Sequence, residues 1–315
     1  MKSKNLTRGV VMTLGVVALL LLGQPPALSG PVITRASPPE PDPHERTRTR
    51  YEAFKGGRKL WGHGVGRKIA FTFDDGPHYY TTPRLLDHLD RFGVKATFFI
   101  NSNRSSPWGL VSSKNFRVLQ EAHRRGHLIG NHTHSHPQLA SLPSAKQRQQ
   151  IELTDRIIRR VTGVESFLFR PPYGAMSAYS GELLKKRGST VVMWSVGSED
   201  DKYFNVSKVL NAVMQKLERQ GGGVVLMHDT HYWTVESMPP ILKAIRIEAC
   251  KQLARGEEPF EVVGLEYFWV PRQGQKPRRS QANTRAWLTR RAALAKLCRT
   301  QPRAPLPAFI RGESS

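Results

Sequence analysis

Adjacent acids and clustered histidines are the residues of this chain best suited to chemistry. Asp74 and Asp75 directly follow the apolar run KIAFTF, and the segment NHTHSHP places three histidines within five residues. His132 and His136 share one face if this segment forms a helical turn, whereas His134 would point elsewhere. Imidazoles with a nearby carboxylate suit a divalent transition metal, above all zinc. Taken singly, each segment could instead be a polar turn or a His-rich surface loop.

The sequence around these aspartates and histidines limits the reactions that they could catalyse. Side chains of adjacent residues point in different directions, so one aspartate could bind a metal while the other faces a substrate. Between the outer histidines stand Thr133, His134 and Ser135, so the glutamate of an HExxH metalloprotease is absent. Neither a GxGxxG turn nor a Walker motif opens any predicted helix, and nucleotide binding therefore has no support.

Two further clusters end apolar runs later in the chain. In FRPPYG, Arg170 follows the run SFLF. Pro171 and Pro172 fix the backbone ahead of Tyr173, whose N–H could be held toward a reacting centre. In LMHD, His228 ends the apolar run GGGVVLM. A proline-bent strand exit and a structural histidine are the simpler interpretations of these two clusters in isolation.

Short apolar runs alternate with helical stretches from Arg67 to Val270, which predicts a mainly parallel sheet with helical crossovers. Seven or so strands could close into a barrel or open into a doubly wound sheet, and periodicity does not choose between them. All four clusters follow predicted strands. Because loops at the carboxyl ends of parallel strands gather functional groups in both folds, we expect the clusters to lie together. The predicted strands are 68–73, 96–100, 127–131, 166–169, 190–196, 223–227 and 260–270, and the predicted helices are 83–92, 116–125, 145–161, 180–187, 209–220 and 239–254.

The motifs TFDDGP, ATFF, GNHTHSHP, RPPYG and LMHD occur in this order between Lys68 and Phe268, over about two thirds of the chain. In this order and at these separations they resemble the polysaccharide deacetylase family, carbohydrate esterase family four, which includes chitooligosaccharide and peptidoglycan N-acetylglucosamine deacetylases. The resemblance implies an irregular (β/α) barrel of about seven strands. It also implies metal-dependent hydrolysis of acetyl groups from an N-acetylated polysaccharide, either chitin-like or a peptidoglycan glycan.

The resemblance implies a role for each clustered residue. Asp75, His132 and His136 would hold the metal, zinc first, with cobalt, nickel or iron as alternatives. Asp74 would be the general base, and Arg170 would keep it ionised and oriented. Three protein ligands leave a coordination position where water and an acetyl carbonyl can meet, which agrees with the implied hydrolysis.

The remaining implied roles concern the oxyanion, the leaving group and the substrate wall. The Tyr173 N–H and the metal would stabilise the oxyanion, and His228 would protonate the leaving amine, with Asp200 tuning its pKa. The family commonly has a tryptophan where this chain has Asp201, and Trp233 is the candidate for the missing face. The residues implied in substrate binding are Pro171, Pro172, Gly174 and Trp233.

The two ends of the chain differ from its middle. Residues 1–30 combine a basic start with an apolar run of 14 residues, which predicts a secretory signal or an uncleaved membrane anchor. Residues 31–65 have the composition of a linker, 66–270 form the predicted deacetylase domain, and 271–315 form a basic tail with eleven Lys and Arg against one acid. We therefore expect an exported protein that is periplasmic, secreted or anchored facing outside.

The basic tail could form an amphipathic helix across TRAWLTRRAALAKLCR or stay a solvated, disordered segment. The only cysteines are Cys250 and Cys298, so neither a disulfide-rich scaffold nor a cysteine-based zinc site can be built. In an exported protein the two could pair, or one could be a buried thiol and the other a thiol in the tail.

Charge and fold leave other functions open. The formal net charge of +23 attracts nucleic acid, anionic membrane and acidic wall polymer alike. The export signal and the metal cluster argue against nucleic acid, so we expect the tail to meet anionic cell-wall polymer or a membrane surface. The same fold could cleave O-acetyl groups or a small amide, and the chain could instead be a weakly catalytic wall-binding module.

Overall fold

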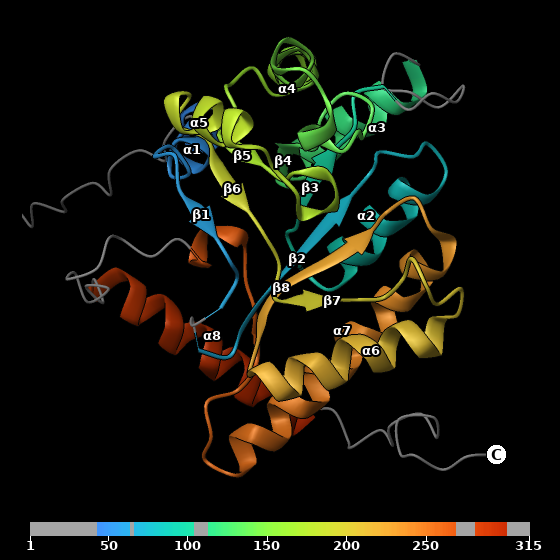
Figure 1. Cartoon of the computed structure of the whole chain (residues 1–315). Coiled ribbons are helices and arrows are strands. Elements are labelled where there is room, and N and C mark those ends of the chain that lie inside the picture. Colours follow the sequence, from blue (N-terminus) through green and yellow to red (C-terminus); the bar gives the residue numbers. More distant parts are fainter. Residues whose placement is uncertain (1–42, 64–65, 104–112, 269–280, 301–315) are drawn as a thin grey trace, which may run out of the picture. The chain divides into compact units, whose positions relative to one another are not determined.

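The computed structural model describes residues 43–63, 66–103, 113–268 and 281–300 of the chain. A parallel sheet lies at its centre, with helices packed around it (Figure 1). The strands are β1 (Lys59–Leu60), β2 (Lys68–Asp74), β3 (Thr97–Ile100), β4 (Leu128–Asn131), β5 (Leu168–Phe169), β6 (Thr190–Val192), β7 (Val196–Gly197), β8 (Gly223–His228) and β9 (Glu261–Val262). The α-helices are α1 (Pro43–Glu52), α2 (Thr81–Arg91), α3 (Ser113–Arg124), α4 (Ser144–Thr162), α5 (Ala178–Lys186), α6 (Val206–Gln220), α7 (Tyr232–Ala254) and α8 (Gln281–Thr300), and the 3₁₀ helices are η1 (Leu139–Ser141), η2 (Pro172–Gly174) and η3 (Leu265–Phe268).

The strands form one sheet in the order β1-β6-β5-β4-β3-β2-β8-β7, and β9 also pairs with β2. Every pairing between the described strands is parallel. The sheet curls around an interior, and the predicted irregular (β/α) barrel is confirmed (Figure 1). Its described part has nine strands instead of about seven. The two additional strands, β1 and β7, have two residues each, which is too short to leave a periodic pattern in the sequence.

The pattern of β2 explains how the sheet positions a functional side chain. Ile69, Phe71 and Phe73 pack outward in one core with the surrounding helices, whereas Ala70 belongs to a second core inside the barrel. Because side chains alternate between the two faces of a strand, Asp74 falls on the inner face. Both faces of β2 are covered, which is why KIAFTF is apolar with little alternation.

The register brings the carboxyl ends of the strands to one edge of the sheet. Asp74 lies opposite Phe99 of β3 and His228 of β8. Asn131 of β4 lies opposite Phe169 of β5. The segments that follow these strand ends therefore meet at the same edge, as a parallel arrangement requires.

Folded structure begins inside the segment 31–65, which its composition had suggested as a linker. Tyr51 and Phe54, near the end of α1, have only 1% and 0% of their surface exposed. The Tyr51 hydroxyl accepts a hydrogen bond of 2.9 Å from the Ile129 N–H. Two aromatic anchors within a Pro- and Arg-rich stretch leave no periodic signal, so the sequence placed the boundary too late. The signal or anchor predicted in 1–30 lies outside the described residues.

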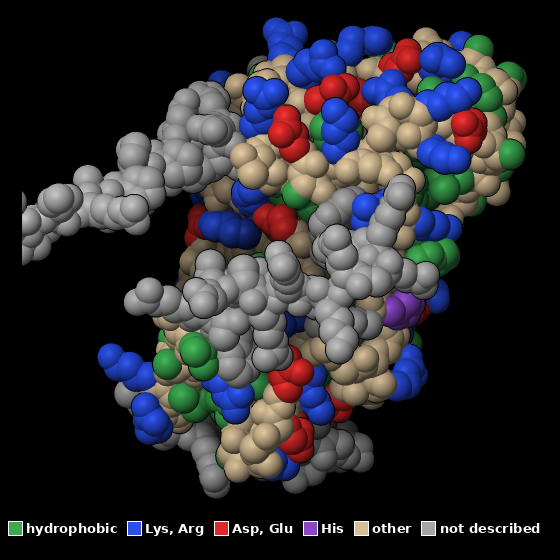
Figure 2. Space-filling view, turned by 90° about the vertical axis from the view of Figure 1, so that its left-hand side faces the viewer, with side chains coloured by type: hydrophobic (Ala, Val, Ile, Leu, Met, Phe, Trp, Pro, Cys, Tyr) green, Lys and Arg blue, Asp and Glu red, His purple; other side chains and the backbone are tan. Residues whose placement is uncertain are grey.

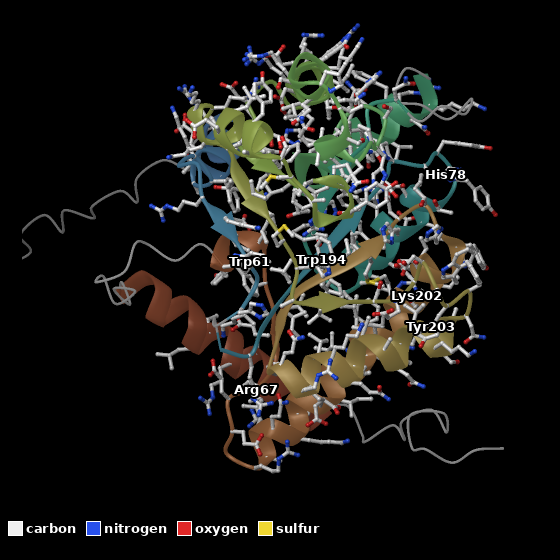
Figure 3. All side chains as sticks on the ribbon, in the orientation of Figure 1. Trp61, Arg67, His78, Trp194, Lys202 and Tyr203 are labelled. Carbon is white, nitrogen blue, oxygen red and sulfur yellow. A yellow bond between two sulfur atoms is a disulfide. The ribbon has the colours of Figure 1, made fainter. Side chains whose placement is uncertain are left out.

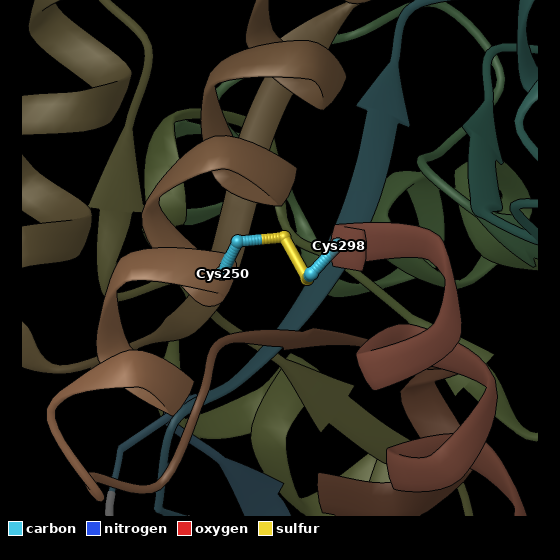
Figure 4. The surroundings of a disulfide bond; sticks show 2 residues. All are labelled: Cys250 and Cys298. Carbon is cyan, nitrogen blue, oxygen red and sulfur yellow. A yellow bond between two sulfur atoms is a disulfide. The ribbon is translucent and has the colours of Figure 1, made fainter. Parts of the chain in front are cut away.

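Helix α8 lies within the basic tail, and a disulfide between Cys298 and Cys250 joins it to α7 (Figure 4). Leu294 of α8 packs against the core formed by the sheet and its helices. Of the two alternatives for this part of the tail, the structure has the helix, and the two cysteines are paired.

The predicted strand 190–196 is split into β6 and β7. β6 pairs with β1 and β5, whereas β7 pairs with β8 on the other side of the sheet, so one continuous strand cannot serve both. The predicted strand 260–270 contributes only β9 before the chain turns into η3. Helix α7 begins at Tyr232, ahead of its predicted start at Pro239.

The positive charge is not confined to the tail. Lys and Arg side chains are spread over the face of the molecule seen in Figure 2, with Asp and Glu between them. Among the helices of the described ranges, none combines the length and the apolar character needed to cross a membrane.

Candidate metal and catalytic site

A cavity of about 410 Å³ opens at the carboxyl ends of the strands. It brings together side chains from all of the clusters that the sequence singled out, including Tyr173 of RPPYG. The acids and histidines that line it are Asp74, Asp75, His132, His136, Asp200, His228 and His231, with Glu199 and Asp201 at one side.

Asp75, His132 and His136 form a group that could hold a metal ion, because one donor atom from each lies within 4.8 Å of the others. Asp75 Oδ1 lies 3.7 Å from His132 Nε2 and 3.5 Å from His136 Nε2. The segment is not the helical turn that the spacing suggested: His136 has a left-handed backbone with φ of 57°. An irregular loop therefore turns both rings toward Asp75. The Nδ1 of His134 lies 2.7 Å from the Ser102 hydroxyl, apart from this group.

His132 is held in the tautomer that a metal ligand needs. Its Nδ1 lies 2.7 Å from the Arg170 carbonyl oxygen, which can only accept, so the proton resides on Nδ1 and the Nε2 lone pair faces Asp75. Burial lowers the pKa of His132 to about 3 although Asp75 opposes the shift, and the ring stays neutral. Two imidazoles beside a carboxylate match the donor set of a divalent transition metal, so these residues fit the implied ion.

Asp74 lies beside this group in a buried ion pair. The fully buried Arg170 donates to Asp74 Oδ1 at 2.7 Å, to the Thr72 hydroxyl at 2.8 Å and to the Val192 carbonyl oxygen at 3.0 Å. These three acceptors fix the guanidinium on several sides. Asp74 Oδ2 lies 3.7 Å from His132 Nε2, so the second carboxylate oxygen is on the side of the metal-binding group.

The environment of Asp74 shifts its acidity in two directions. Burial raises the pKa of the carboxyl, while the positive charges of Arg170 and His228 lower it, and the net shift is upward. Arg170 thus favours the ionised form of Asp74, as the resemblance implied. The opposing effect of burial on the Asp74 pKa is larger. A carboxylate whose pKa is raised is a stronger base than an exposed one.

His228 and Asp200 form a second buried pair. His228 Nδ1 lies 2.8 Å from Asp200 Oδ1, and the His228 N–H and the Thr234 hydroxyl donate to Asp200 Oδ2 at 2.7 Å and 2.6 Å. Burial lowers the pKa of His228, but the hydrogen bond and charge of Asp200 outweigh it and raise the pKa to about 9. His228 is therefore an imidazolium at neutral pH, with its Nδ1 proton held by Asp200.

The turn η2 forms the side of the cavity next to His136. The Tyr173 ring meets the His136 ring at an angle of 67°, with the centroids 4.7 Å apart. Pro171 and Pro172 have no N–H, so the Tyr173 N–H is the first in this turn, and an N–H at the start of a helical turn has no acceptor within it. Both prolines are buried, and Pro171 also lines the cavity.

Trp194 lines the cavity, although no pattern in the sequence marked it. It stands in the break between β6 and β7 (Figure 3). Gly174 of η2 has φ of 68°, and a Cβ there would lie 3.2 Å from the Trp194 ring. The glycine thus permits close packing of the indole against the turn. The apolar run 190–196 conceals this position, because the break depends on which strands β6 and β7 pair with.

Trp233 is not among the described residues that line the cavity. Its indole N–H donates to the Asp200 carbonyl oxygen at 2.7 Å. Its ring stacks on His231 with centroids 4.8 Å apart and planes at 14°. His231 itself lines the cavity. Trp233 therefore lies behind Asp200 and His231, and Trp194 is the tryptophan that lines the cavity among the described residues.

The segment after β7 adds charge to the cavity. Asp201 and Lys202 both line it and are exposed to solvent. The Lys202 ammonium lies 2.6 Å from Glu199, and Figure 3 shows Lys202 and Tyr203 beyond the end of β7. This side of the cavity is thus charged at the position where the family commonly has a tryptophan.

The chain is similar in sequence and fold to known proteins. A family profile described as polysaccharide deacetylase matches residues 62–192. Peptidoglycan-N-acetylglucosamine deacetylase PgdA of Listeria monocytogenes is 36% identical over 208 residues, which are 65% of this chain and 42% of that protein. Chitin deacetylase of Colletotrichum lindemuthianum is 30% identical over 178 residues, 54% of this chain and 70% of the relative. The solved structure of the Colletotrichum enzyme matches with a TM-score of 0.57 at 26% identity, over 70% of this chain and 94% of that one.

The chain spans about half the length of its bacterial relatives, 42% of the Listeria protein and 56% of a peptidoglycan-N-acetylglucosamine deacetylase of Bacillus cereus. The matched region nevertheless contains the sheet edge that carries the metal-binding group. Sequence, fold and the geometry of the cavity agree, and the chain belongs to the polysaccharide deacetylase family.

Proposed function

We propose that this chain is a metal-dependent hydrolase that removes acetyl groups from an N-acetylated amino-sugar polymer, either chitin-like or a peptidoglycan glycan. One observation supports this most. The Asp74–Arg170 and His228–Asp200 pairs open into the same cavity as a metal-binding group, so a base and an acid lie at one centre. Amide hydrolysis needs both, one for the attacking water and one for the leaving amine.

Asp75, His132 and His136 would hold the ion through a carboxylate oxygen and two imidazole nitrogens. Zinc is the first candidate for these donors, and cobalt, nickel or iron accept the same ones. When bound, a divalent ion lowers the pKa of water and polarises an acetyl carbonyl oxygen.

Asp74 accepts the proton of the attacking water. Arg170 occupies Oδ1, so Oδ2 is the oxygen left to act as base. Arg170 also donates a hydrogen bond to the Thr72 hydroxyl, which fixes the guanidinium. The fixed guanidinium in turn holds the orientation of the Asp74 carboxylate. The positive guanidinium favours the ionised carboxylate that this step requires.

His228 donates a proton to the leaving nitrogen as the carbon–nitrogen bond breaks. Asp200 holds the Nδ1 proton, so the Nε2 proton is the one that can be given. The Tyr173 N–H stabilises the negative oxygen of the tetrahedral intermediate, and a donor of this kind contributes roughly 10²- to 10³-fold in rate. Trp194 and Pro171 offer apolar surface to a sugar ring, and Pro172 and Gly174 hold the shape of that turn.

The proposed function includes export of the protein from the cytoplasm. The Cys250–Cys298 disulfide suits an oxidising compartment, as expected for a protein that acts on a polymer outside the cytoplasm. The basic tail would bind anionic cell-wall polymer or a membrane surface. Nucleic acid is not an expected partner.

Acetate release from N-acetylglucosamine oligomers and from peptidoglycan glycan strands, with and without a chelator, tests the proposal. His132→Ala should lose bound metal and activity together, because it removes a buried ligand. His134→Ala is the matched control, since that ring bonds to Ser102, and it should keep the metal. Metal content is measured by elemental analysis on the folded proteins.

Three outcomes would contradict parts of this proposal. Stoichiometric metal in the double variant His132→Ala/His136→Ala would remove the ligand assignment. Acetate release from acetylated xylan alone would indicate an O-acetyl esterase. Binding to wall material without acetate release, even with added metal, would indicate a binding module.

A further inference from the structure

A second cavity, of about 490 Å³, lies at the opposite edge of the barrel. Its walls come from α7, α8, the turn after α2 and the segment that leads into β9. They are mostly apolar, and the larger apolar side chains are Phe92, Leu242, Ile245, Phe260, Leu294 and Leu297. The volume is in the range of sites that enclose small molecules, about 300 to 1,000 Å³.

This second cavity is separate from the proposed catalytic site. Lys68, the first residue of β2, lines it, whereas Asp74, the last residue of β2, lines the catalytic cavity. Seven residues of extended strand span about 20 Å at ~3.3 Å per residue. The proposed deacetylation therefore leaves the second cavity unexplained.

Cations surround the apolar walls. Five of them line the cavity against one acid, Glu261. Lys68 is neutralised by Glu261, at 2.5 Å. Arg91, Lys243 and Arg246 form no ion pair with any acid of the described ranges, so their charge is available to a ligand. The five cations are Lys68, Arg91, Lys243, Arg246 and Arg291.

A disulfide fixes two of the walls. Ala249 of α7 and Leu297 of α8 line the cavity, and the next residue in each case is a cysteine of the Cys250–Cys298 bridge (Figure 4). The bridge thus holds α8 over the apolar surface of α7. The cavity is consequently a fixed feature of the oxidised protein and does not depend on chance docking of a loose tail.

We infer that this cavity binds the alkyl chain of an anionic amphiphile, with its carboxylate or phosphate at the cationic rim. The apolar walls would leave the hydroxyl groups of a sugar without hydrogen-bond partners, which disfavours a glycan. The unpaired Arg91, Lys243 and Arg246 disfavour a cationic amphiphile and attract an anionic one. A fatty acid and an anionic membrane lipid both have this chemistry.

Fluorescence titration of the disulfide-bonded protein with cis-parinaric acid, followed by displacement, tests the site. Across octanoate, decanoate and laurate, displacement should strengthen about fourfold per methylene (about 0.8 kcal/mol) until the cavity is full. Dodecyltrimethylammonium, of equal chain length and opposite charge, should displace poorly. Equal displacement by laurate and by this cation would overturn the inference.

Two variants test the walls and the rim separately. Lys243→Glu/Arg246→Glu should weaken laurate binding at least about tenfold at low salt, and Leu294→Trp should abolish it by filling the cavity. Arg219→Glu, a charge reversal on exposed α6 outside both cavities, is the control and should bind normally. Thermal unfolding and acetate release identify misfolded variants. Wild-type affinity in the folded rim variant would overturn the inference even if Leu294→Trp failed to fold.

Vesicle binding distinguishes a membrane lipid from a free fatty acid as the ligand. Sedimentation with phosphatidylglycerol vesicles, lost in the rim variant and absent with phosphatidylcholine, would identify a membrane lipid. Laurate binding without vesicle binding would identify a free fatty acid. If neither binds, the inference is wrong.

Discussion

The two sides of the catalytic cavity are built in different ways. On the side formed by β2, β4 and β5, the ionisable side chains are buried: those of Asp74 and His132 are each 4% exposed, and that of Arg170 is 0% exposed. On the side after β7, Asp201 and Lys202 are exposed, and among the neighbouring acids Asp200 is the one that is buried. The groups assigned to proton transfer are therefore buried, whereas the side after β7 presents exposed charges at the mouth of the cavity.

The largest effect is expected on the buried side, for Asp74→Asn. The amide cannot accept a proton, so acetate release should fall roughly 10²- to 10⁴-fold. It is close in shape to the carboxylate, and Asp75 is the proposed ligand, so the metal content should stay at the wild-type level. Elemental analysis and turnover are measured on the same preparation. Loss of metal would mean that the two aspartates have exchanged roles.

On the opposite side, Asp200→Asn should lower the rate at neutral pH roughly 10- to 100-fold. The wild-type His228 has a pKa of about 9 and acts as an acid, so activity should fall as the pH rises through about 9. Without the Asp200 charge the burial of His228 dominates and its pKa drops, so this alkaline limb should move to lower pH. An unchanged limb in the pH–rate profile would show that another group is the acid.

The sequence predicted the buried side of the catalytic cavity more completely than the side after β7. Asp74 and Asp75 could be placed at the end of a strand because KIAFTF is uniformly apolar, and parallel strands bring such ends together. The convergence of His132 and His136 was expected from helical spacing, yet an irregular loop achieves it. Residue types and order thus predicted which groups meet, while the backbone that joins them had no local signature.

The structure of the side after β7 depends on contacts between segments that are distant in the sequence. Trp194 reaches the cavity because β6 and β7 pair with opposite parts of the sheet, which no local pattern encodes. Trp233 follows His228 closely in the sequence, but its N–H is used by the Asp200 carbonyl oxygen. Proximity in sequence therefore did not indicate which tryptophan lines the cavity, since tertiary hydrogen bonding decides where an indole points.

Trp194→Ala tests whether Trp194 contributes to substrate binding without taking part in proton transfer. Loss of aromatic contact with a sugar ring should raise KM about 3- to 10-fold and change kcat less. Trp61→Ala is a matched control, because Trp61 is 51% exposed and is not among the described residues that line the cavity. Steady-state kinetics on N-acetylglucosamine oligomers separate the two constants. A fall in kcat with unchanged KM would place Trp194 in the proton-transfer machinery instead.

The smallest effect is expected for Trp233→Phe, which distinguishes a supporting residue from a wall residue. The phenyl ring can keep the stacking on His231, but it loses the N–H that donates to the Asp200 carbonyl oxygen. One hydrogen bond is worth about 0.5–1.5 kcal/mol, so kcat should fall by less than about tenfold as Asp200 and His228 become less well aligned. KM should stay constant, because Trp233 does not line the cavity. A rise in KM comparable with that of Trp194→Ala, at unchanged kcat, would instead show that the substrate reaches Trp233 and that the wall extends beyond Trp194.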